Sequence, residues 1–279
     1  MQLESDQGDS PPTRRDAAER LRVLEEVRDR GEAHRPARGF ALLGIWSAVL
    51  LSAYAAAALA ILGTTGSVFH LLLPYMIFTL LWRGASERYA VRSRRVWPGA
   101  LLTWAVLAGF MGVGFLRVLG QGIPRWVDAV AVAALFAVFV TRPMRQLRES
   151  SASDGAWEAR PLSGGARGGT MAIGVLLGLL AVMAVLPNAA ILGAFGALLF
   201  GTALAVSGGT PWGAPRTGYE WAPRHWVIFG AGALAVFAIV WLQTLVREAA
   251  LPIGIAAGVL IALPLAGVAL TPRAGRGDS

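Results

Sequence analysis

Long apolar segments recur along this chain, and they constrain its fold more than any other feature. Each segment runs for 17 to 23 residues, and a helix needs about 20 apolar residues to cross a bilayer. The segments are Phe40–Leu62, Gly66–Trp82, Val96–Val118, Ile123–Thr141, Thr170–Leu186, Asn188–Val206, Trp226–Val246 and Ala249–Leu270. We therefore expect an all-α, polytopic bundle of about eight transmembrane helices, of which the second and fifth are the shortest.

Composition agrees with a membrane protein and removes several classes of chemistry. Only 15% of the residues are charged, against about 25% in soluble domains. The chain has no cysteine, which excludes disulfides, thiolate catalysis and cysteine-bound metals. His34, His70 and His225 are far apart in sequence, and no catalytic or phosphate-binding motif is present. We expect no enzyme activity, no cofactor and no bound metal.

The distribution of arginine predicts the orientation in the membrane. If both termini are cytoplasmic, 22 of the 25 arginines lie in cytoplasmic segments and only Arg117, Arg125 and Arg247 lie outside. Short cytoplasmic loops carry such an excess of basic residues. The net charge of +8 therefore belongs to the inner membrane face, and we expect no nucleic acid partner. The expected location is the bacterial cytoplasmic (plasma) membrane, crossed several times.

The segment before the first apolar run has a character of its own. Residues 1–12 are polar and predict a disordered tail, and residues 13–31 predict a cytoplasmic amphipathic helix that begins at a Thr13 cap. Its narrow apolar stripe consists of Ala17, Leu21, Leu24 and Val27. That stripe either rests on the protein's own loops or docks a protein partner or a second protomer.

The two halves of the membrane region share sequence landmarks. Ala37-Arg38-Gly39 and Ala166-Arg167-Gly168 precede corresponding segments, and the pairs Arg94/Arg117 and Arg224/Arg247 each stand 23 residues apart. The pattern predicts an internal repeat of four helices, over 38–143 and 167–272, with a cytoplasmic linker at 144–166 and a tail at 273–279. An even number of helices would make the repeats parallel. Alternatively, two four-helix halves share loop charges for topological reasons alone.

Polar residues are scarce at the centres of the apolar segments, so candidate site residues gather at the expected outer rim. They are His70, Arg117, Arg125, Asp128, Arg247 and Glu248, with Gln121 and Gln243 nearby. Arg117 and Arg247 would form a basic pair for an anionic group such as a carboxylate or a lipid phosphate. In the alternative, these side chains reach the headgroups and pair locally with Asp128 and Glu248. The lack of a carboxylate at mid-membrane argues against an ion-coupled transporter.

Small and aromatic residues predict packing and membrane boundaries. Gly174, Gly178, Gly254 and Gly258 form two GxxxG motifs, which favour close helix contacts within the chain. The hydroxyls of Ser47, Ser52, Tyr54, Thr103 and Thr202 are expected to bond a neighbouring helix or their own backbone. Seven tryptophans near segment ends predict an aromatic belt: Trp46, Trp82, Trp97, Trp126, Trp212, Trp221 and Trp226. The loop 207–225 is expected to lie at the interface rather than to re-enter the membrane.

These features favour a transporter-type or permease-like membrane subunit. A tandem repeat of even helix number creates a central interface where substrates commonly bind. The alternative is a membrane-anchored regulatory or scaffold protein that acts through its N-terminal helix, and an enzyme is the third possibility. The expected partner common to all three is the lipid bilayer.

Overall fold

The computed structural model describes residues 38–62, 69–88, 97–150, 161–210, 212–245 and 251–271, and all regular structure in these ranges is α-helical. The elements are α2 (Arg38–Ile61), α3 (Phe69–Arg88), α4 (Trp97–Val118), α5 (Arg125–Glu149), α6 (Gly164–Ala184), α7 (Ala189–Ser207), α8 (Ala214–Glu220), α9 (Pro223–Leu245) and α10 (Leu251–Leu270). Each predicted apolar segment overlaps one long helix, which confirms the all-α fold class. The predicted N-terminal helix lies outside the described residues.

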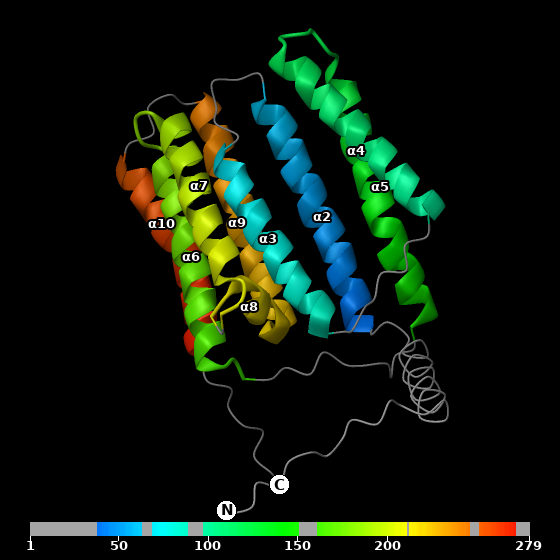
Figure 1. Ribbon diagram of the computed structural model, residues 1–279. Coiled ribbons are helices and arrows are strands. Elements are labelled where there is room, and N and C mark those ends of the chain that lie inside the picture. Colours follow the sequence, from blue (N-terminus) through cyan, green and yellow to red (C-terminus); the bar gives the residue numbers. More distant parts are fainter. Residues whose placement is uncertain are drawn as a thin grey trace, which may run out of the picture. The chain divides into compact units, whose positions relative to one another are not determined.

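The long helices alternate in direction (Figure 1). α2, α4, α6 and α9 begin at one end of the bundle, and α3, α5, α7 and α10 return to it. Of the eleven arginines in the described ranges, nine lie at the end where α2 begins, while Arg117 and Arg125 lie at the opposite end. This separation is what the predicted orientation requires, although the orientation itself remains a prediction.

Apolar side chains cover the outside of the helices as well as the inside. On α4, Leu102, Trp104 and Met111 are 59%, 70% and 67% exposed, whereas soluble proteins rarely expose large continuous apolar patches. Within the described ranges, six helical stretches are long and apolar enough to cross a membrane: Arg38–Ile61, Ala100–Val118, Arg125–Glu149, Gly164–Ala184, Pro223–Gln243 and Leu251–Leu270. The chain is an integral, multi-pass membrane protein.

The other two long helices, α3 and α7, meet these criteria less fully. α3 ends in a polar stretch that contains Arg83, Glu87 and Arg88, and the apolar stretch of α7 covers only Ala189–Leu204. The predicted count of eight crossings therefore remains a prediction. The predicted fifth segment, one of the two shortest, is among the six, because α6 begins at Gly164 rather than at Thr170.

The main core lies where α3, α6 and α9 meet. Leu81 of α3, Leu177 of α6 and Phe229 of α9 have no exposed surface and belong to one buried cluster. The aromatic-belt prediction is wrong for Trp221 and Trp226, which are 0% and 1% exposed in this cluster. The cluster joins the two predicted repeats, so apolar packing occupies the central interface where a polar substrate site was expected.

The first and fourth helices of each predicted repeat form its most extensive contact: α2 packs on α5, and α6 packs on α10. The halves differ elsewhere, because α9 packs on both α6 and α2. By contrast, α4 packs mainly on α5, and α8 has no counterpart among the described helices of the first half. The shared pairing of the first and fourth helices supports the predicted repeat, whereas the other contacts differ between the halves. The repeat therefore remains a prediction.

Helix α5 is longer than the sequence predicts. We expected it to end at Thr141, before Pro143, because proline removes a backbone hydrogen bond from a helix interior. Instead α5 continues through Pro143 to Glu149. The proline ring lies against Gly44 of α2, where an added Cβ would stand 2.7 Å from Pro143 Cγ. The absent side chain of Gly44 leaves room for the ring.

Candidate functional site

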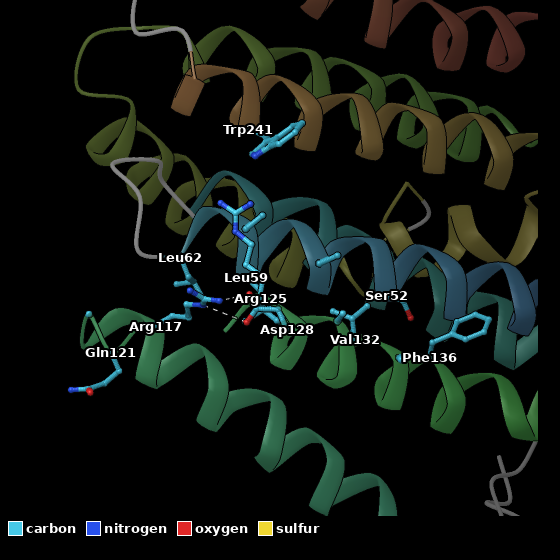
Figure 2. Close-up of a pocket in the computed structure, with 15 residues that line it drawn as sticks. Ser52, Leu59, Leu62, Arg117, Gln121, Arg125, Asp128, Val132, Phe136 and Trp241 are labelled. Atoms are coloured by element: carbon cyan, nitrogen blue, oxygen red, sulfur yellow. Dashed lines mark hydrogen bonds and ion pairs between the residues drawn. The ribbon is translucent and has the colours of Figure 1, made fainter. Parts of the chain in front are cut away.

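A pocket of about 910 Å³ opens at the end of the bundle where α4 is joined to α5 (Figure 2). We call it the rim pocket. Residues of α2, of the end of α4, of the α4–α5 connection and of α5 line it, together with one tryptophan of α9. These residues are Ser52, Ala56, Leu59, Ala60, Leu62, Arg117, Gly120, Gln121, Arg125, Asp128, Ala129, Val132, Ala133, Phe136 and Trp241. Its volume lies within the range of about 300–1,000 Å³ that is typical of small-molecule sites.

An ion pair holds the mouth of the rim pocket together. Arg117, near the end of α4, donates from Nη2 to Asp128 Oδ2 at 2.6 Å and from Nε to Oδ1 at 3.3 Å. Both side chains are only partly exposed, at 21% and 23%. The local pairing expected in the alternative interpretation is therefore present for Arg117. This two-point contact joins α4 to the first turn of α5, where the helix dipole also favours a carboxylate.

Arg125 stands at the other side of the mouth, as the first residue of α5. Its guanidinium points toward α9, where Trp241 lies (Figure 2). Within the described part of the chain, no carboxylate forms an ion pair with Arg125. With Asp128 neutralised by Arg117, the described lining residues carry one remaining positive charge, and it belongs to Arg125.

Below the mouth, the rim pocket is apolar. The lining residues of α5 extend from Asp128 to Phe136, and eight residues of helix span about 12 Å at 1.5 Å per residue. Ser52 marks the deepest point on α2, and its hydroxyl already donates to Ala48 O at 2.7 Å. The pocket therefore reaches from a charged mouth to nearly the middle of a hydrocarbon core about 30 Å thick.

The predicted outer-rim cluster is thus assembled in part. The structure brings Arg117, Arg125 and Asp128 together with Gln121. His70 is separate: it is 1% exposed in the first turn of α3, with its ring against Gly193 of α7. Arg247 and Glu248 lie outside the described residues, so the proposed basic pair of Arg117 and Arg247 is untested. The apolar stripe of the N-terminal helix lies outside them as well.

The two GxxxG motifs face each other across α6 and α10. A Cβ added to Gly178 would lie 2.6 Å from Gly258 O, and one added to Gly258 would lie 2.7 Å from Gly178 O. Gly174 contacts Leu265, and Gly254 contacts Val185. The glycines allow the two backbones to approach within a single protomer, and they form no part of the rim pocket.

A second polar assembly, which the sequence patterns do not predict, lies at the opposite end of the bundle. The loop 207–225 contains the short helix α8, and Gly84 and Gly218 allow the backbones of α3 and α8 to touch. The buried Trp221 donates from Nε1 to Thr170 Oγ1 at 2.8 Å. Glu220 accepts from Ser163 N at 2.7 Å. This arrangement anchors α8 on α3 and α6.

Three of the predicted mid-membrane hydroxyls agree with the structure. The hydroxyls of Ser47, Ser52 and Thr202 bond carbonyls of their own helices, as predicted for mid-membrane hydroxyls. Among the residues that the structure describes, no group of three or more His, Asp or Glu side chains is placed to hold a metal ion. The rim pocket is therefore the strongest candidate site. Comparisons with protein-family models, with curated proteins and with solved structures found no significant match.

Proposed function

We propose that this protein is a transporter-type membrane subunit whose substrate enters through the rim pocket. The observation that carries the proposal is the pocket itself, which is charged at its mouth and extends along α2 and α5 to Ser52. In the predicted orientation, the mouth faces the outside of the cell. A purely structural membrane anchor does not require a pocket of this size with a residual positive charge at its mouth.

The position of the pocket also suggests how access would change. It lies between α5 on one side and Trp241 of α9 on the other, with α2 between these two helices. Of the most apolar stretches of α4 and α5, only 6% is buried within the chain, against 50% for α6 and α9. The α4–α5 pair joins the rest of the bundle mainly through the contact of α5 with α2, so a movement of the pair against α2 would alter the pocket.

The experiment uses the lack of cysteine in the natural chain, which makes single-cysteine variants free of background. Ser52→Cys places a thiol at the deep end of the pocket with little change in volume. Leu198→Cys is the control, because Leu198 is 70% exposed in the middle of α7 and would face lipid. A charged, membrane-impermeant thiosulfonate reagent is added to intact cells and to inside-out vesicles, since such a reagent needs a hydrated thiolate.

A transporter should expose the same site to each side in turn. We therefore expect labelling of Ser52→Cys from both sides and no labelling of Leu198→Cys from either. Labelling of Ser52→Cys from the outside alone would contradict transport and leave a one-sided binding site. Labelling from neither side would show that the pocket is closed to water and would contradict the proposal entirely.

A further inference from the structure

We propose that the rim pocket binds a single-chain amphiphile with an anionic headgroup, which Arg125 recognises. The inference deepens the proposed function by naming its ligand class. It rests on that function only in taking the rim pocket as the ligand site, and it does not depend on movement of the ligand across the membrane. Three properties of the pocket lead to this class.

The first property is the charge of the mouth. Asp128 is held at two points by Arg117, so these two charges offset each other. Arg125 lines the pocket, and its guanidinium has no ion-pair partner in the described ranges. A guanidinium presents paired donors that match a carboxylate or a phosphate. The mouth therefore favours an anionic group and disfavours a cation.

The second property is the apolar interior. The walls below the mouth consist of small and aliphatic residues of α2 and α5 with one aromatic ring: Ala56, Leu59, Ala60, Ala129, Val132, Ala133 and Phe136. The one hydroxyl at the deep end, on Ser52, is already bonded within its helix. A sugar or an amino acid placed there would leave polar groups without partners, at a cost of several kcal/mol. An alkyl chain fits these walls.

The third property is the position of the charged mouth relative to the apolar walls. The charged mouth stands at the end of the helices and the apolar walls run along them for about 12 Å, so the axis of the pocket follows the helix axes. A ligand that places its charge at the mouth must extend its remaining length parallel to the lipid chains. This is how an anionic lipid with one acyl chain would lie.

The test compares three probes that separate charge from chain. They are myristoyl lysophosphatidate, the lysophosphatidylcholine of equal chain length, and glycerol 3-phosphate, which has the phosphate without the chain. The full-length protein is kept in a non-ionic detergent, and native mass spectrometry measures the bound fraction. Arg125→Gln is compared with Arg145→Gln, which removes an exposed arginine of the same helix outside the rim pocket.

We expect lysophosphatidate to bind at least about tenfold more tightly than either other probe, because a charge-assisted contact and the chain both contribute. Arg125→Gln should weaken its binding by about tenfold, and Arg145→Gln should leave it unchanged. Asp128→Asn should strengthen binding several-fold, since it releases the charge of Arg117. Ala133→Phe should weaken the binding of lysophosphatidate, because the larger side chain narrows the pocket. Ala133 is exposed, so the variant should fold.

Each contrary result has a distinct meaning. Equal binding by Arg125→Gln and the natural chain would overturn the role of Arg125. Equal binding of glycerol 3-phosphate would indicate a site for free phosphate, and equal binding of the phosphatidylcholine analogue would show that headgroup charge is not recognised; either would overturn the ligand class. Tight binding of lysophosphatidate together with one-sided labelling of Ser52→Cys would contradict the proposed transport but support the lipid site.

Discussion

The contact between α6 and α10 offers the sharpest test of how this bundle is held together. In Gly258→Ala, the new Cβ would lie 2.7 Å from Gly178 O and 2.9 Å from a methyl carbon of Val182, whereas ordinary contact begins at 3.4 Å. The Val182 side chain can rotate, but the Gly178 carbonyl belongs to a helix backbone. The two helices must therefore separate by about 0.7 Å at this point.

The expected loss of stability follows from that separation. A gap of about 0.5–1 Å forfeits a quarter to a half of the dispersion energy of each affected contact, and overpacking typically costs about 1–3 kcal/mol. Alanine is a better helix former than glycine by up to about 1 kcal/mol. We expect Gly258→Ala to lower the free energy of unfolding by about 1–2 kcal/mol.

The control lies on the same helix. An added Cβ at Gly267 of α10 would meet nothing within 4 Å. Gly267→Ala should therefore be neutral or stabilising by up to about 1 kcal/mol. Gly178→Ala should behave like Gly258→Ala, and the double variant should cost less than the sum, because one separation of the helices relieves both clashes.

The assay is reversible unfolding of the purified protein from a mild detergent into dodecyl sulfate, followed by tryptophan fluorescence and circular dichroism. Equal stability of Gly258→Ala and Gly267→Ala would contradict the close contact of α6 and α10, since the two variants differ in what the new methyl group meets. If the losses of stability in the two single variants add up in the double variant, the two helices do not move apart as a unit.

Two further predictions concern the anchoring of α8. Trp221→Phe removes the buried hydrogen bond to Thr170 Oγ1 and should destabilise the protein by about 1–3 kcal/mol. The same unfolding assay measures this loss, and an unchanged unfolding midpoint would show that the hydrogen bond does not stabilise the protein. Gly84→Ala would place a Cβ 1.7 Å from Pro215 O, which no small adjustment can relieve, so folded protein in the membrane fraction should fall severely. Gly109→Ala, where nothing lies within 4 Å, is its control, and equal yields of the two variants would contradict the close packing.

Much of the rim pocket follows from the positions of charged residues in the sequence. Arg117, Arg125 and Asp128 stand at the ends of two apolar segments joined by a short connection, so a helical hairpin necessarily brings them to one end. The ion pair between Arg117 and Asp128 is a local consequence of that hairpin. The contributions of Ser52 and Trp241 could not be predicted, because they depend on which faces of α2 and α9 turn toward α5.

The packing at the other end was harder to predict for a related reason. The loop 207–225 has glycine, proline and aromatic residues that are typical of an interfacial loop. Its burial depends on the backbone contact between Gly84 and Pro215, two residues 131 positions apart. No local sequence pattern predicts such a contact. The positions of Trp221 and Trp226 near segment ends predict a place at the membrane boundary, whereas both are core residues.

Local sequence patterns are enough to predict the elements: long apolar segments, their helical state and the separation of arginine between the two ends of the bundle. These properties follow from local rules, because in lipid each segment must satisfy its own backbone hydrogen bonds. Which faces of the helices meet becomes visible only in the tertiary structure. In a membrane, the lipid chains are as apolar as the protein core, so hydrophobicity does not distinguish a buried face from a lipid-facing one. That choice places the core between α3, α6 and α9 and leaves the charged rim pocket beside α2, α5 and α9.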